Sequence, residues 1–132
     1  MRAELKRLHS PDVNGALETF SPQDRTEFGI LVQIMAGPEG EEAEESFDVR
    51  VCTPTWLLKR LGTEPLSGRY HLFVQRYDYT ALAGFIAAYC HACTGETWSE
   101  VAARLGRLGR WEFEDYNVSK TRRGSDGRAE EP

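Results

Sequence analysis

Two thiols and an imidazole stand together in the sequence Cys90-His91-Ala92-Cys93. Cysteines separated by two residues occur as redox pairs and as half of a tetrahedral zinc site. A redox pair of this kind usually lies at a helix amino terminus, where the helix dipole lowers the thiol pKa. Here the apolar residues repeat at three and four positions, which places both sulfurs near the carboxyl end of a helix, on its apolar face. The pattern therefore favours cysteines of the hydrophobic core.

A zinc site built on this pair needs two further ligands. The candidates in the chain are Cys52, His91, His71 and His9. An enzyme or sensor that uses Cys90 and Cys93 is the alternative to a core role for these residues.

Other catalytic patterns are missing from the sequence. No serine has the flanking glycines of a nucleophile elbow, and His71 and His91 lie among apolar neighbours without an evident acidic partner. The run Gly37-Pro38-Glu39-Gly40 lacks the lysine and hydroxyl residue of a phosphate-binding loop, so we expect a turn. We therefore predict no catalytic residue, no metal and no cofactor.

Acidic residues are concentrated in two segments. Six acids fall between Glu39 and Asp48, and three more lie in Trp111–Tyr116. Such clusters serve solubility, or they form a docking face for a basic partner. The candidate partner-binding residues are Glu112, Glu114, Asp115, Glu41, Glu42, Glu44 and Glu45. Acids on a strand lose less entropy on binding than acids on a turn, so Glu112 and Glu114 are expected to be the better anchors.

The first half of the chain predicts three strands. The first is Arg2–His9, and the second is Phe28–Met35, whose nearly continuous apolar run predicts burial on both faces. The third is 47–51, where alternation directs three apolar side chains to the core: Phe47, Val49 and Val51. The second and third strands, joined by the acidic turn, form an antiparallel hairpin.

Three helices are expected after the hairpin. Thr53-Pro54 starts the first and Gly62 stops it; its apolar residues are Trp56, Leu57, Leu58 and Leu61. Asp78 caps the longest helix, which Gly95 ends; its apolar residues are Leu82, Phe85, Ile86, Tyr89, Cys90 and Cys93. The third begins with the capping-box sequence Thr97-Trp98-Ser99-Glu100 and ends at Gly109.

Two more strands complete the pattern. Tyr70–Gln75 is one, and Trp111–Tyr116 closes the fold, with Trp111 and Phe113 facing the core. The predicted fold class is α+β, a mainly antiparallel sheet with two to three helices packed on one face. We expect a single domain over residues 1–118. The tail 119–132 has no apolar residue larger than alanine, so we expect it to be disordered.

Composition limits the function further. The 132 residues are 40% hydrophobic and carry a net charge of -5, which argues against sequence-independent nucleic-acid binding. The mean hydropathy of -0.52 and the short apolar stretches argue against a membrane span. The charged amino terminus is unlike a signal peptide, and the three cysteines suit a reducing compartment, so we expect a cytoplasmic protein.

Two segments resemble a known family. Phe-Asp-Val-Arg-Val-Cys-Thr-Pro-Thr-Trp-Leu (47–57) and Trp-Glu-Phe-Glu-Asp-Tyr (111–116) are similar to the two signatures of immunity protein 8. The resemblance extends from Arg2-Ala3-Glu4-Leu5 to Tyr116 and leaves out the tail. Proteins of this family are small α+β proteins encoded beside bacterial polymorphic toxins.

The resemblance implies a non-enzymatic antidote that binds a cognate toxin domain and blocks its active site or substrate groove. Toxins of such systems, which include contact-dependent inhibition, are often nucleases with basic grooves, and an acidic inhibitor is complementary to such a groove. The implied partner is thus a toxin protein, with no direct nucleic-acid or membrane partner. The residues alone leave the second hypothesis open, a small thiol- or zinc-dependent enzyme or sensor at Cys90 and Cys93.

Overall fold

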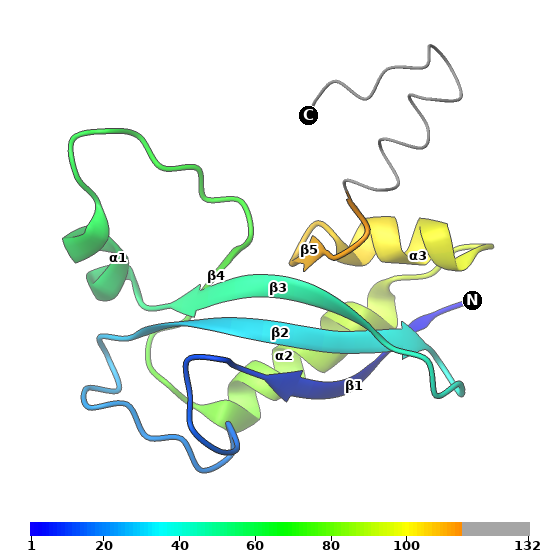
Figure 1. The fold of residues 1–132 in the computed structure, drawn as a ribbon, viewed down its shortest axis with the longest axis horizontal. Coiled ribbons are helices and arrows are strands. Elements are labelled where there is room, and N and C mark those ends of the chain that lie inside the picture. Colours follow the sequence, from blue (N-terminus) through cyan, green and yellow to red (C-terminus); the bar gives the residue numbers. More distant parts are fainter. Residues whose placement is uncertain (115–132) are drawn as a thin grey trace.

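A long antiparallel hairpin forms the centre of the fold (Figure 1). In the computed structural model, which describes residues 1–114, β2 (Gly29–Pro38) and β3 (Glu45–Cys52) pair from Gly29 opposite Cys52 to Ala36 opposite Glu45. β1 (Ala3–His9) adds to the free edge of β2, also antiparallel, with a register shift between Leu5 and Arg7. The predicted hairpin and first strand are confirmed.

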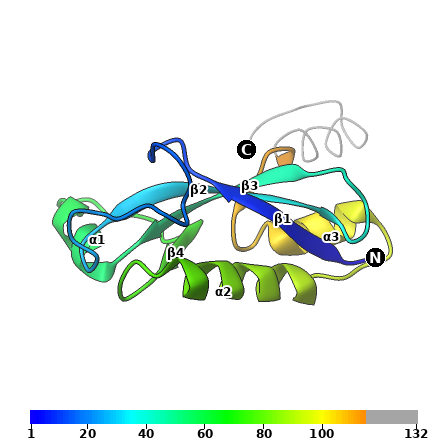
Figure 2. The same cartoon turned by 90° about the horizontal axis from the view of Figure 1, so that it is seen from below.

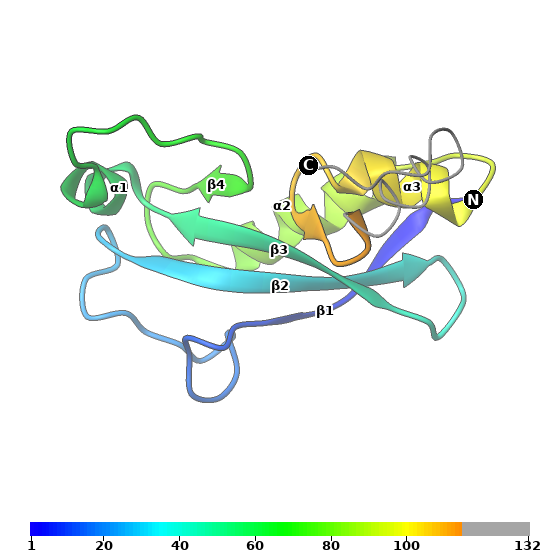
Figure 3. The same cartoon turned by 45° about the horizontal axis from the view of Figure 1, so that its top comes forward.

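The other edge of β3 is shared by two short strands. β4 (His71–Phe73) runs parallel to the end of β3, and β5 (Arg110–Trp111) pairs antiparallel with Phe47 and Asp48. Figure 3 shows β4 and β5 lying one after the other along this edge. The sheet is therefore mixed but mostly antiparallel, which confirms the α+β class.

Two helices cover one face of the sheet (Figure 2). α2 (Tyr79–Ala92) and α3 (Trp98–Leu105) pack their buried residues against the inward side chains of β2 and β3. The fully buried centre of this core includes Val32, Ile34, Phe47, Val49, Val51, Ile86, Cys90, Val101 and Leu105. α1 (Pro54–Arg60) lies at one end of the sheet and has no buried residue.

Side-chain caps start each helix where the sequence predicts. Thr53 accepts a hydrogen bond from the Trp56 amide, Asp78 from Ala81, and Thr97 from Glu100. Each cap satisfies one of the amides that the first helical turn leaves without a partner. The helix ends differ from the predicted glycines, because the C-caps are Leu61, Cys93 and Gly106.

Within residues 1–114, no helix covers the middle of the second face of the sheet (Figure 2). Along β2 the buried residues Ile30, Val32 and Ile34 alternate with half-buried Leu31 and Gln33. The expectation that this strand is buried on both faces was therefore wrong. The core forms between the sheet and the two helices on its first face. We call the second face the open face; the apolar Leu31 and Met35 lie on it, opposite Arg50 and Ser46 of β3.

The closing strand is much shorter than predicted. Only Arg110 and Trp111 pair with β3, and a turn follows at residues 112 and 113. Trp111 is buried as expected, but Phe113 is 39% exposed, so its predicted core position was wrong. Phe85, placed on the apolar face of α2 by its spacing, is likewise 50% exposed.

The domain boundary expected at residue 118 and the tail 119–132 lie outside the described residues. Of the helices in residues 1–114, none combines the length and the apolar composition that a membrane crossing requires.

Candidate partner-binding surfaces

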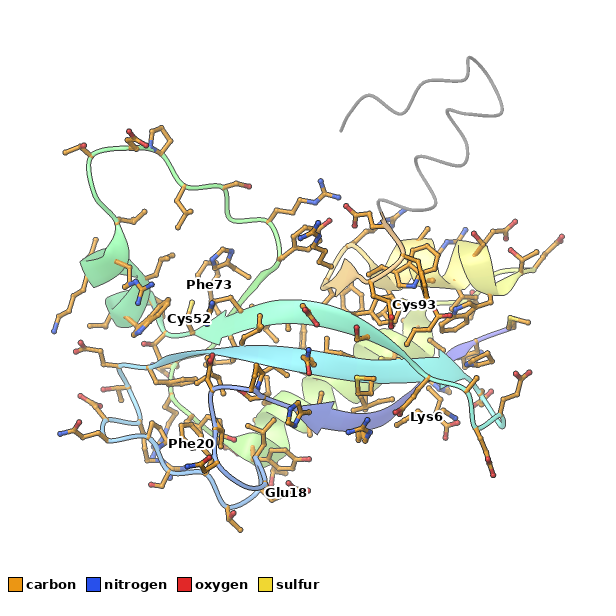
Figure 4. All side chains as sticks on the ribbon, in the orientation of Figure 1. Lys6, Glu18, Phe20, Cys52, Phe73 and Cys93 are labelled. Atoms are coloured by element: carbon orange, nitrogen blue, oxygen red, sulfur yellow. The ribbon has the colours of Figure 1, made fainter. Side chains whose placement is uncertain are left out.

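The β2–β3 turn lies at one end of the molecule (Figure 1). This end, called here the acidic end, carries the turn acids Glu41, Glu42, Glu44 and Glu45. β1 holds the turn through two cations. Lys6 Nζ donates to the backbone carbonyl of Glu41 at 2.5 Å, and Arg7 donates to the Glu44 carboxylate at 3.0 and 3.1 Å. Figure 4 shows Lys6 beside this turn. The turn is therefore anchored at its base.

Among the turn acids, Glu41 and Glu42 are the ones available to a partner. Both side chains are exposed, and within residues 1–114 neither carboxylate makes a hydrogen bond or ion pair. They extend the negative potential of the turn outward without an internal cation to neutralise them.

Glu45 has a structural role in the fold. Its Oε1 accepts hydrogen bonds from Trp98 Nε1 at 2.9 Å and from Trp111 Nε1 at 2.7 Å. One carboxylate oxygen thus joins the start of α3 and β5 to the base of the hairpin. Hydrogen bonds to an ionised acceptor are the stronger kind, and the acceptor also satisfies the indole of buried Trp111.

Glu112 and Glu114 are also held by internal contacts. Glu112 Oε1 accepts from the Ser46 amide at 2.6 Å, while the Glu112 amide donates to the Ser46 carbonyl at 3.1 Å. Glu114 accepts from the Tyr70 hydroxyl at 2.7 Å, with Arg69 at 3.8 Å. Burial and the bond to Glu114 raise the pKa of Tyr70 to about 12. Glu112 and Glu114 were predicted to be the better anchors because they would lie on a strand, but β5 ends at Trp111 and neither acid is part of it.

The structure thus divides the candidate acids into two sets. Glu44, Glu45, Glu112 and Glu114 contribute charge from positions fixed by internal bonds, whereas Glu41 and Glu42 are free to bind. Asp115 lies outside the described residues.

Asp48 is a further acid, on the open face of the sheet. Its Oδ1 is buried and has no hydrogen-bond partner among the described residues. Burial raises the pKa of this carboxyl, the nearby Glu112 charge adds to the effect, and Arg110 opposes it. Sequence reasoning counted Asp48 among the turn acids but had no signal for this environment, because neither Glu112 nor Arg110 is near it in sequence.

The Cys90 and Cys93 thiols are core groups with raised pKa values. Burial raises the pKa of Cys90 to about 12 and also raises that of Cys93, whose Sγ donates to the Tyr89 carbonyl. Reactive thiols and metal ligands need the opposite shift, toward thiolate. Within residues 1–114 no group of three His, Cys, Asp or Glu side chains is placed to hold a metal ion.

Sequence reasoning missed a second surface at the opposite end, around α1 and β4. Three large apolar residues follow one another in α1: Trp56, Leu57 and Leu58. Successive residues of a helix are rotated by about 100°, so three in a row cannot all face the same sheet. Leu58 is 71% exposed, and Trp56 lies against Gly29 of β2. That angular spread was the available signal that part of this helix faces outward.

The model of the immunity protein 8 family matches residues 3–116. The chain belongs to the immunity protein 8 family. Comparisons with curated proteins and with solved structures gave no match.

Within this immunity protein 8 chain, the two signature segments have mainly structural roles. Residues 47–57 supply the inward side chains of β3 and the Thr53 cap. Residues 111–114 supply the Trp111 indole, which stacks on Phe47 with 6.4 Å between ring centroids, and the two carboxylates that bind Ser46 and Tyr70. Together they attach the end of the described chain to β3 and to the start of β4.

Proposed function

We propose that this protein neutralises a cognate toxin by binding the toxin domain encoded beside it and covering a basic substrate groove, as a nuclease would have. The observation that carries the proposal is the family match over residues 3–116, which implies immunity against a toxin. It also suggests a role that is not enzymatic, and the burial of the Cys90 and Cys93 thiols is consistent with that role.

The acidic end is the surface proposed to face the groove. Glu41 and Glu42 make the direct contacts, while Glu44, Glu45, Glu112 and Glu114 add to the negative potential, and Asp115 is included from the sequence. Complementary potential speeds the encounter of two proteins and selects their relative orientation. We further propose that binding takes place in the cytoplasm, where a toxin that attacks nucleic acid finds its substrate.

Co-expression with the adjacent toxin domain tests this function. The wild-type chain should restore growth that the toxin alone prevents. The Glu41→Lys/Glu42→Lys variant should protect less at low expression, because its association with the toxin is slower.

The matched control is Glu18→Lys/Ala87→Lys/Ala88→Lys, which makes the same change in net charge at three exposed positions away from the turn and from the surface around α1 and β4. Figure 4 shows Glu18 on the β1–β2 loop. The control should protect as wild type does. Failure of the wild-type chain to protect would reject the proposed function, and equal loss in both variants would reject the acidic end as its site.

A further inference from the structure

The end of the molecule around α1 and β4 exposes more large apolar side chains than any other region of residues 1–114. We call this surface, residues 54–76, the apolar end. The exposed fractions are 71% for Leu58, 41% for Leu61, 54% for Leu66 and 48% for Phe73. α1 buries no residue, so the fold alone gives little reason for its apolar side chains. Apolar patches of this kind mark interaction sites.

The charge of the apolar end is opposite to that of the turn. Between Leu58 and Arg76 there is one acid, Glu64, against four cations: Lys59, Arg60, Arg69 and Arg76. The turn segment from Glu39 to Asp48 has six acids and no Lys or Arg. Lys59 and Arg69 are paired with Glu27 and Glu114, whereas Arg60 and Arg76 make no ion pair within residues 1–114. This end therefore carries unpaired positive charge beside its exposed apolar side chains, which is complementary to a partner surface that is acidic.

Aromatic and guanidinium groups are stacked at this end. Arg60 lies over the Trp56 ring at 4.7 Å, and Arg69 lies over the Tyr70 ring at 4.7 Å. Trp, Tyr and Arg are the residues that most often dominate binding energy at protein interfaces. Stacking also holds the two arginines in place before a partner arrives, which lowers the entropy lost on binding.

The apolar end continues into the open face of the sheet. Trp56 packs on Gly29 of β2, and Phe73 stands opposite Cys52 of β3 in register, as Figure 4 shows for Phe73 and Cys52. The ten residues of β2 span about 33 Å. A compact domain of 100 residues is roughly 30–35 Å across. One toxin domain lying along the open face can therefore reach both ends.

Resting on the proposed function, we propose that the apolar end is the contact that holds the toxin. It binds a part of the toxin surface where apolar side chains are surrounded by carboxylates, outside the basic groove. The acidic turn accelerates association but offers almost no apolar area to bury. Leu58, Leu66 and Phe73 supply that area, and Arg60 and Arg76 pair with the toxin carboxylates.

Surface plasmon resonance with the purified toxin domain tests the inference. Leu58→Asp and Leu58→Lys change the same exposed side chain, and Leu58→Asp/Leu66→Asp removes a larger part of the apolar end. Ala88→Asp is the matched control, because Ala88 is exposed on α2 and lies outside the pocket that Phe73 and Arg76 line with the start of that helix. Circular dichroism and the urea midpoint confirm that each variant is folded.

The double variant should dissociate roughly tenfold faster or more, with an association rate close to that of wild type. Leu58→Asp should dissociate faster than Leu58→Lys, because the partner surface is acidic. Ala88→Asp should match wild type. An unchanged dissociation rate in the folded double variant would overturn the inference while leaving the proposed function intact. A greater effect of Lys than of Asp would overturn the acidic partner chemistry, and no binding by wild type would reject the proposed function itself.

Discussion

Replacing Glu45 by alanine should destabilise the protein strongly although Glu45 lies in the acidic segment. The Glu45 carboxylate oxygen is the acceptor for both the Trp98 and the Trp111 indoles, at 2.9 and 2.7 Å. The change removes both hydrogen bonds at once and leaves two N–H donors without that partner.

The expected cost follows from the burial of the two indoles. Trp111 is 8% exposed, so loss of its charged acceptor should cost about 1.5–3 kcal/mol. Trp98 is half-buried and its N–H can turn to water, so its bond contributes about 0.5–1 kcal/mol. Glu45→Ala should therefore lower the free energy of unfolding by about 2–4 kcal/mol. Glu45→Gln retains a carbonyl acceptor and should cost about 1 kcal/mol.

Urea titration followed by circular dichroism measures these changes, with Glu42→Ala as the control in the same turn. The Glu42 carboxylate has no partner in residues 1–114, so its removal should change stability by less than about 0.5 kcal/mol. A double-mutant cycle with Trp111→Phe should show coupling, because both changes break one bond. If Glu45→Ala is as stable as Glu42→Ala, the structural role assigned to Glu45 is refuted.

Three further predictions concern the core and the open face. Trp111→Ala should cost about 3–5 kcal/mol in guanidinium titration, because a buried ring stacked on Phe47 is lost, and a cost below about 1 kcal/mol would contradict its burial. A thiol reagent at neutral pH should label the three buried cysteines slowly in the native protein and quickly after unfolding; rapid native labelling would contradict their raised pKa values. Asp48→Asn should raise stability at pH 7, because a carboxyl whose folded pKa is raised loses stability as the pH rises through that pKa. This gain should shrink as the pH falls toward 3.8, the ordinary pKa of an aspartate, and a gain independent of pH would refute the role of charge.

Local patterns predicted most of the first 100 residues. Alternation at Phe47, Val49 and Val51 identified their face because β3 stays in the sheet throughout, with β2 along one side. The helix starts were predictable because a cap and its amide lie only three residues apart. In each case the interaction that decides the structure lies within a few residues of the signal.

The end of the described chain could not be predicted in this way. Trp111 to Glu114 alternates like a strand, but the chain turns after Trp111. The turn coincides with contacts that join Glu112 to Ser46 and Glu114 to Tyr70, residues 66 and 44 positions away. Alternation assigns faces only while the chain remains in the sheet. For the same reason, the sequence does not indicate which acids bind other residues of this chain and which, like Glu41, do not.

Isothermal titration of the purified toxin domain with this protein tests the central claim most directly. We predict saturable binding of one toxin domain to one chain, with a dissociation constant of about 10 nM or lower at physiological salt and weaker binding at higher salt. Absence of binding by the folded protein to a folded, active toxin domain would contradict the account.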